Sequence, residues 1–289
     1  MPVALQRFLY HRVPGGRRLL RLLYWPRRRY HAWREALQRR RHPELLDRCE
    51  ARTFSQHGED GVLAEIFRRL NVSHGYFVEF GVEHGRENNT LALARQGWRG
   101  LWLERVPQHC EHARAAIATH AAAIVLLERF VTRENILDLL ASQGVPDDLD
   151  LLSIDVDGND YWIAERILER YHPKVLVVEY NAFFARGEDF VIDYAPDFRW
   201  DQSNYFGASL KTFTSMMQQH GYALVGCERA GVNAFFVRRD LARGRFHSPA
   251  DPVAFFYRAP KYGLYWGHPS RAVVNPGHHV TSGAPAHRR

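Results

Sequence analysis

Glycines and carboxylates capable of binding a ligand follow the first short apolar run of the sequence. The run from Tyr76 to Phe80 leads into an E-x-G-x-x-x-G turn formed by Glu79, Gly81 and Gly85. Glycines in such a turn let the backbone approach a ligand closely, and an acid at a strand end can bind hydroxyl groups or an amine. The spacing is not the G-x-G-x-x-G of dinucleotide sites, so a pyrophosphate is not the expected ligand.

Later apolar runs also end in acidic residues. Glu104 follows the second run at about the distance at which an acid accepts hydrogen bonds from ribose hydroxyls. The next three runs are followed by further polar residues, namely Glu128, then Asp155, Asp157 and Asp160, then Glu179 and Asn181. A cleft lined by carboxylates suits a cationic ligand that carries a ribose, a description that S-adenosylmethionine fits. An acid before a helix can instead be only an N-cap, and Asp160 is a candidate for that simpler role.

The elements that must position these residues alternate along the chain. Helical patterns cover residues 63–70, 91–95, 108–119, 136–140, 161–170 and 210–220, and strand patterns cover 76–80, 101–103, 123–127, 151–154, 175–178, 222–225 and 234–237. Such alternation predicts an α/β fold, with a mostly parallel sheet and helices on both faces. The last two strands, joined by a short turn, predict an antiparallel hairpin at one edge. Ligands of such sheets bind outside the carboxyl ends of the strands, where the acids lie.

Longer motifs accompany these turns. They are residues 55–61 (SQHGEDG), 75–90 (GYFVEFGVEHGRENNT), 97–104 (GWRGLWLE), 152–161 (LSIDVDGNDY), 175–181 (VLVVEYN) and 205–237. On these motifs, about residues 53 to 240 resemble the FkbM-type S-adenosylmethionine-dependent methyltransferases. The resemblance implies the class I methyltransferase (Rossmann-like) fold, a seven-stranded sheet whose last strand is antiparallel. It also implies O-methylation of a hydroxyl, typically on a sugar or glycan or on a polyketide-like metabolite.

The resemblance further implies roles for individual residues. Those expected to contact the cofactor are Gln56, Asp60, Glu79, Gly81, Gly85, Glu104, Glu128 and Asp155. Among them Glu104 matches the acid that binds the ribose, and Gln56 and Asp60 lie in a motif that folds over the cofactor. Asp157 stands where many members have a longer glutamate.

Methyl transfer to a hydroxyl requires alignment of the two substrates and removal of the hydroxyl proton. One interpretation assigns the proton to a general base, with Asp157, Glu179 and His84 as the candidates. The other assigns a divalent cation that lowers the pKa of the alcohol. Mg²⁺ prefers hard oxygen ligands, and the candidates are Asp155, Asp157, Asp160, Glu179 and Asn181.

A long aromatic insertion follows the fifth strand. Residues 181–210 contain eight aromatic residues, about twice the 13% average of the chain. Long loops in compact domains are typically lids or binding loops, so this insertion is the candidate acceptor site. A hydrophobic cluster that seals the edge of the sheet explains the composition equally well.

The net charge of +7 is unevenly distributed. Residues 1–50 hold thirteen arginines, no lysine and four acidic residues, so they carry +9, whereas residues 51–289 carry −2. The composition of this arm predicts either peripheral contact with an anionic membrane or a helical extension packed on the core. A third interpretation is a mitochondrial transit peptide, which the lack of Ser and Thr disfavours. We divide the chain into the arm (1–50), a methyltransferase domain (51–266) and a tail (267–289) rich in His, Pro and Gly that is expected to be disordered.

Other classes are disfavoured. The near-neutral body lacks the basic stripe that tracks a phosphate backbone, so nucleic acid is not expected as a partner. A nicotinamide-dependent oxidoreductase would need the missing glycine motif, and a catalytically silent binding module of the same fold would be expected to lose the acids. The three cysteines are widely spaced and predict no metal site. No apolar run of eighteen residues and no adequate signal sequence occur, so a cytoplasmic protein is expected.

Overall fold

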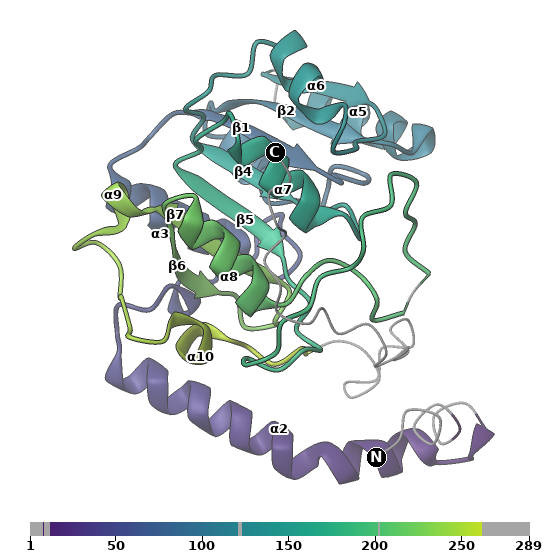
Figure 1. Cartoon of the computed structure of the whole chain (residues 1–289), viewed down its shortest axis with the longest axis vertical. Helices are drawn as coiled ribbons and strands as arrows, with labels where there is room; N and C mark the ends of the chain where they lie inside the picture. Colours follow the sequence, from purple (N-terminus) through teal and green to yellow (C-terminus); the bar gives the residue numbers. More distant parts are fainter. Residues whose placement is uncertain (1–7, 9–11, 121–122, 202, 262–289) are drawn as a thin grey trace, which may run out of the picture.

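A computed structural model describes residue 8 and residues 12–120, 123–201 and 203–261 of the 289-residue chain. Its elements in order are α2 (Gly16–Arg41), the 3-10 helix η1 (Leu46–Arg48), α3 (Glu59–Leu70), β1 (Tyr76–Phe80), α4 (Leu91–Ala94), β2 (Arg99–Glu104), α5 (Pro107–His120), β3 (Ile124–Glu128), α6 (Ile136–Ser142), β4 (Leu151–Ile154), α7 (Asp160–Leu168), β5 (Val175–Glu179), α8 (Leu210–Gln219), β6 (Tyr222–Cys227), β7 (Asn233–Arg238), α9 (Arg239–Ala242) and α10 (Pro252–Phe256) (Figure 1). The tail predicted from residue 267 lies outside the described residues.

The described strands form one seven-stranded sheet in the order β3-β2-β1-β4-β5-β7-β6. Strands β1 to β5 are parallel, and β7 pairs antiparallel with both β5 and β6. The predicted α/β fold with a closing antiparallel hairpin is therefore confirmed, and the sheet has the seven strands and the antiparallel last strand of the class I methyltransferase fold. All seven predicted strands and all six predicted helices are present, with ends that differ by a few residues.

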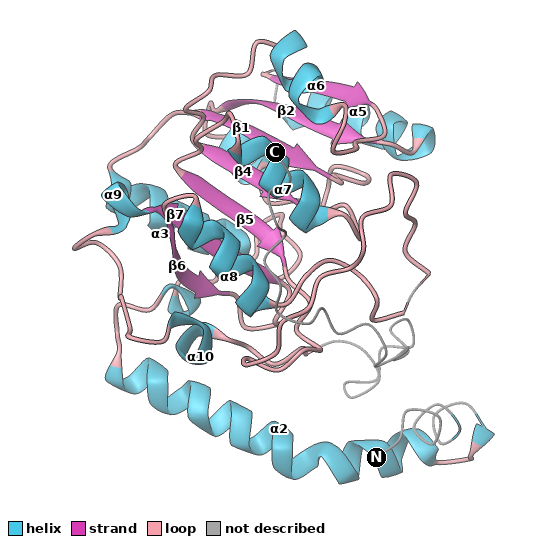
Figure 2. Cartoon of the chain, in the orientation of Figure 1, coloured by secondary structure: helices cyan, strands magenta, loops and turns pink. Residues whose placement is uncertain are grey.

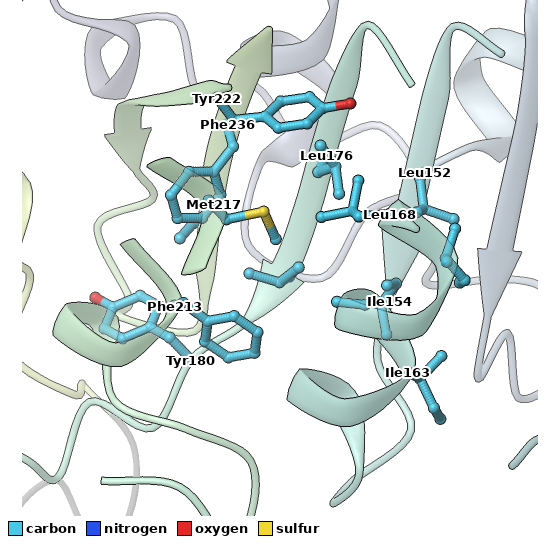
Figure 3. Close-up of a cluster of buried hydrophobic side chains, with 14 of the residues drawn as sticks. Leu152, Ile154, Ile163, Leu168, Leu176, Tyr180, Phe213, Met217, Tyr222 and Phe236 are labelled. Atoms are coloured by element: carbon cyan, nitrogen blue, oxygen red, sulfur yellow. The ribbon is translucent and has the colours of Figure 1, made fainter. Parts of the chain in front are cut away.

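Helices cover both faces of the sheet, and each face has its own apolar core (Figure 2). Successive strand side chains point to opposite faces. Along β5, Leu176 and Val178 belong to the cluster beneath α6, α7 and α8, whereas Val175 and Val177 belong to the cluster beneath α3 and α4. Figure 3 shows the first cluster, in which side chains of the strands meet those of the neighbouring helices. Because β5 is buried on both faces, its sequence is apolar without alternation from Val175 to Val178.

Helix α2 packs on the body through its C-terminal half. The Arg34 guanidinium donates to the carbonyl oxygens of Ala254 and Tyr257 in the α10 region, and Glu35 accepts from Lys261 at 3.0 Å. Just after the helix, the buried carboxylate of Asp47 pairs with the buried guanidinium of Arg258 at 2.9 Å. The C-terminal part of the arm is thus a packed helical extension. The proposed domain bounds stay a prediction.

The segments at α9, α10 and η1 had no sequence prediction. Each has five residues or fewer, so it spans little more than one turn and cannot display an amphipathic period. In the described part of the chain, none of the helices has the length and apolar composition that would be needed to cross a bilayer.

Candidate functional site

A cavity of about 1060 Å³ opens at the carboxyl ends of the parallel strands. It lies where the strand order reverses, because β1 has β2 on one side and β4 on the other. This topological switch point is the expected ligand site of an open α/β sheet. The volume lies at the upper end of the range of ligand pockets, about 300–1000 Å³.

The two glycines of the first turn have different structural roles. Gly81 lines the cavity with a positive φ of 70°, and an added Cβ would lie 1.7 Å from the Asp155 carbonyl oxygen. Gly85, with φ of 66°, is not among the lining residues; an added Cβ would meet Trp102 of β2 and Ala113 of α5 within about 3 Å. Gly81 therefore keeps the floor of the cavity open, and Gly85 allows α5 to approach the sheet.

Glu104 lines the cavity at the end of β2 and is almost fully buried. Its carboxylate accepts hydrogen bonds from the backbone N–H groups of Glu83, Arg105 and Val106, at 2.8–2.9 Å. These bonds fix the carboxylate in one orientation and tie the loop after β1 to the loop after β2. Such a fixed carboxylate can accept hydrogen bonds from a ligand diol with little loss of side-chain entropy.

Glu79 does not line the cavity. Its buried carboxylate accepts from the backbone N–H groups of Asn89 and Thr90 and from the Asn88 side chain, so it organises the start of α4. Burial raises the pKa of Glu79 to about 7, although these hydrogen bonds oppose the shift. The structure therefore gives this predicted cofactor residue a supporting position behind the glycine turn.

Asp60 also does not line the cavity but supports a loop of its wall. One carboxylate oxygen accepts from the backbone N–H groups of residues 53–55, and the Asp60 N–H donates to the Ser55 hydroxyl. This loop carries Gln56 and His57, both of which line the cavity. Gln56 therefore lies where a ligand could reach it, whereas Asp60 shapes the loop. The cofactor contacts predicted for this motif stay a prediction.

Asp155, Asp157 and Glu179 come together on the β4–β5 side of the cavity. Each offers one carboxylate oxygen, and these three atoms lie within 4.8 Å of one another. The Asp157 backbone has a positive φ of 56°, an unusual conformation for a residue with a side chain. Three of the five predicted metal ligands thus converge, and oxygen ligands at this separation could hold a divalent cation.

The other two predicted ligands, Asp160 and Asn181, are buried and are not among the lining residues. Asp160 accepts from the backbone N–H groups of Val156 and Gly158, and burial raises its pKa to about 6. The N-cap of α7 is Asn159, so the N-cap expected at Asp160 is wrong; its carboxylate folds the preceding turn instead. The Asn181 amide donates to backbone carbonyls of Asn204 and Phe206 and thereby holds the insertion.

Glu128 lies outside the cavity although it is the register neighbour of Glu104. It is partly exposed and pairs with Arg114 of α5 at 3.4 Å. Two acids at adjacent strand ends therefore occupy different environments, a contrast that the sequence pattern could not reveal.

His84 lines the cavity on the Glu104 side. Its ring lies 4.4 Å from that of His109 and 5.1 Å from that of His112, both on α5. Asp157 lies in the turn after β4 and Glu179 is the last residue of β5, on the other side of β1. The three candidate bases are therefore divided between two sides of the cavity.

The aromatic insertion, residues 181–210, contributes both to the cavity wall and to a hydrophobic cluster. Phe198 and Trp200 line the cavity. Phe184 and Phe190 stack at 3.8 Å outside it, and Phe190 and Phe206 are buried. Part of the insertion is thus a cavity wall and part is a hydrophobic cluster.

Several cavity residues had no sequence prediction, mostly on loops between strands and helices. They include two acids, Glu83 and Glu87, and three arginines, Arg86, Arg105 and Arg129. No periodic signal marks such loop residues. The available cue is position: Glu83, Arg86 and Glu87 lie in or beside the glycine turn, and Arg105 and Arg129 directly follow the acids at two strand ends. Six acids against three arginines line the cavity in all, an excess of negative charge that favours a cationic ligand.

Comparisons with known proteins place the chain in no family. No family model and no curated protein matches the sequence. Among solved structures, a putative O-methyltransferase from Klebsiella pneumoniae is 20% identical over 72% of this chain and 96% of that chain, with a TM-score of 0.43. The O-methyltransferase TomG from Streptomyces achromogenes in complex with SAM is 17% identical over 63% of this chain and 80% of that chain, with a TM-score of 0.39. The strand order and strand directions of the sheet define the fold of this chain.

Proposed function

We propose that the protein is an S-adenosylmethionine-dependent methyltransferase that methylates a hydroxyl oxygen. The observation that carries the proposal is a single acidic cavity at the switch point of the sheet, which has the fixed Glu104 carboxylate on one side of β1 and Asp155, Asp157 and Glu179 on the other. A ligand that binds across β1 would meet a hydroxyl-binding acid at one end and a carboxylate cluster at the other.

The residues fit the parts of the cofactor. Glu104, whose carboxylate is held in place by three backbone N–H groups, would accept hydrogen bonds from the ribose hydroxyls. Gly81 would present backbone without a side chain to the cofactor, and Gln56 would contact the methionine part from the loop that Asp60 holds. The excess of carboxylates favours the positively charged sulfonium and amine over an anionic ligand.

The bound cofactor supplies an activated methyl group. Transfer of this methyl group from the sulfonium to an acceptor oxygen would require that the two substrates be aligned and that a base take up the hydroxyl proton. Asp157 and Glu179 are the bases on the side opposite Glu104, whereas His84 lies among the histidines near Glu104. Because Glu104 is assigned to the ribose, we assign proton removal to the opposite side of the cavity, where Asp157 and Glu179 lie.

The same carboxylates fit a divalent cation. Asp155, Asp157 and Glu179 would hold Mg²⁺, which lowers the pKa of a bound alcohol when it is present. Asp160 and Asn181 would contribute only by shaping the surrounding turns.

The acceptor would enter beside the insertion. Phe198 and Trp200 place aromatic rings in the cavity wall, a surface suited to the ring of a sugar, a glycan or a polyketide-like metabolite. We propose an acceptor of this class.

Calorimetry tests the cofactor assignment. Wild-type protein is expected to bind S-adenosylmethionine and not NAD, and Glu104→Gln to weaken S-adenosylmethionine binding about tenfold, the equivalent of one lost hydrogen bond to a charged group. Glu128→Gln is the matched control, since Glu128 is the register neighbour of Glu104 outside the cavity. Thermal unfolding of both variants checks that the fold is retained.

Binding of NAD alone, or equal weakening by both substitutions, would refute the assignment. Cofactor binding without methyl transfer to any hydroxylated acceptor would instead indicate a silent binding module.

A further inference from the structure

Helix α2 exposes an apolar stripe to solvent. Its residues recur at helical spacing and are all exposed: Leu19, Leu22, Leu23, Pro26, Tyr30 and Trp33. At 100° per residue they fall within an arc of about 100°, the width of a face that normally packs on a core. Leu22 and Trp33 are 63% and 61% exposed. Of the nine large hydrophobic residues that are exposed in the described part of the chain, seven lie between residues 8 and 33.

The stripe does not face the body of the protein. The side of α2 that contacts the body carries Arg34, Glu35 and Gln38, which bind the α10 region and Lys261. These contacts fix the rotation of the helix about its axis. They hold the polar side inward and the apolar stripe outward, the reverse of the usual arrangement for a helix on a globular protein.

The charge of the arm selects the kind of partner. Residues 1–50 carry +9, and the exposed Arg18 and Arg29 lie along one edge of the stripe, with the Arg29 guanidinium 4.7 Å from the Trp25 ring centroid. Two copies packed stripe to stripe would bring these charges together and repel. An anionic surface with an apolar interior satisfies both features, because the stripe enters the boundary of the acyl chains while the arginines contact the headgroups. Trp25, Tyr30 and Trp33 have the amphipathic rings that are enriched at this boundary.

We propose that the exposed stripe of α2 docks the protein onto an anionic lipid bilayer, with the helix lying in the plane of the interface. The helix is well placed for this, since it is the outermost element beyond α10 and α10 packs on the edge strand β6 (Figure 1). No cavity-lining residue belongs to α2, so docking uses no part of the ligand site. The proposal is therefore independent of the activity of the protein.

Sedimentation of the full chain with vesicles tests the proposal. The protein is expected to pellet with vesicles of phosphatidylcholine and phosphatidylglycerol at 3:1, and to pellet far less with phosphatidylcholine alone. Leu22→Ser/Leu23→Ser should lower the bound fraction at least tenfold. Val125→Ser is the matched control, because Val125 is 50% exposed on β3, outside the arm, and its substitution should change nothing.

A second variant isolates the charge. Arg18→Gln/Arg29→Gln should reduce binding to the anionic vesicles and weaken its salt dependence, while thermal unfolding stays unchanged for every variant. Failure of the wild type to pellet, or equal pelleting of Leu22→Ser/Leu23→Ser, would overturn the proposal. A dimer in sedimentation velocity that this variant converts to a monomer, with no vesicle binding, would show that a second copy covers the stripe instead.

Discussion

A Cβ atom added to Gly81 would lie 1.7 Å from the carbonyl oxygen of Asp155. The contact joins the turn after β1 to the turn after β4, the two strands that flank the switch point. The backbones meet so closely that only a glycine fits, and its φ of 70° is also one that side chains disfavour. This contact sets the distance between the two sides of the acidic cavity.

Gly81→Ala is expected to lower the free energy of unfolding by at least about 3 kcal/mol, since a backbone atom cannot move aside as a flexible side chain can. Urea unfolding measures the change. Gly144→Ala is the matched control: Gly144 has a similar φ of 64° but nothing within 4 Å of an added Cβ, so its cost should be about 1 kcal/mol. Equal costs would show that the contact with Asp155 does not constrain the fold.

The convergent carboxylates predict cation binding that depends on Asp157. Calorimetric titration of the wild type with Mg²⁺ should give a site that Asp157→Asn weakens at least about tenfold, because one charged oxygen ligand of three is lost. Asp197→Asn, which changes an exposed acid of the insertion, should have no effect. A second group of potential ligand atoms lies close together on His42, Glu44 and His247. If the Asp157→Asn variant still gives binding heat, adding His247→Ala shows whether the ion binds at this second group.

Full methyl transfer in the presence of EDTA would leave the general base as the only route for the proton. Loss of activity in EDTA that Mg²⁺ restores would instead assign the cluster to the cation.

Because Glu228 is buried, we expect the free energy of unfolding to fall as the pH rises. Burial, reinforced by the nearby Glu59, raises its pKa to about 8 in the folded state, against 4.5 for the unperturbed group. Between these values the folded state holds a proton that the unfolded state releases, so the stabilisation is complete below pH 4.5 and is lost as the pH approaches 8. The free energy of unfolding should therefore decrease from pH 5 to pH 8.5, and Glu79, whose pKa is raised to about 7, adds to the same trend.

Glu228→Gln should flatten this pH dependence, as measured by urea unfolding at pH 5, 7 and 8.5. The partly exposed Glu128 provides the control, and Glu128→Gln should retain the slope of the wild type. A slope unchanged by Glu228→Gln would assign the proton uptake to other groups.

The buried ion pair of Asp47 with Arg258 joins the arm to the segment after α10, so we expect it to contribute strongly to the free energy of unfolding. Both side chains are about 98–99% buried, so Asp47→Ala would leave a buried guanidinium without its partner and cost about 3–5 kcal/mol in the free energy of unfolding. Asp240 pairs with Arg238 at the surface, and Asp240→Ala should cost less than about 1 kcal/mol. Urea unfolding compares the two, and similar losses would mean that the buried pair does not anchor the arm.

The secondary structure could be predicted from the sequence because the patterns that indicate it are local. Strands such as β1 and β4 have the bounds predicted for them, since a short apolar run between turn residues is a property of a few neighbours in sequence. The short helix α10 escaped prediction because its stability comes from packing on β6 and α2 and not from its own pattern.

The candidate site was predictable as a set of strand ends but not as a list of contacts. Glu104 and Glu128 occupy equivalent positions in the pattern, yet one lines the cavity and the other pairs with Arg114 at the surface. Asp157 lines the cavity whereas Asp160, three residues later, folds back onto its own turn. Burial and hydrogen-bond partners separate such residues, and both depend on parts of the chain far away in sequence.

The sequence by itself determined the alternation of elements, the acids at the strand ends and the basic, apolar character of the arm, because each of these depends on residue type and local spacing. The tertiary structure decided which acids face the cavity and which support it. It also decided that the apolar stripe of α2 faces outward, because the contacts of Arg34, Glu35 and Gln38 fix the rotation of the helix. Amphipathic spacing gives a helix two faces, but only packing against the rest of the chain selects which one meets the solvent.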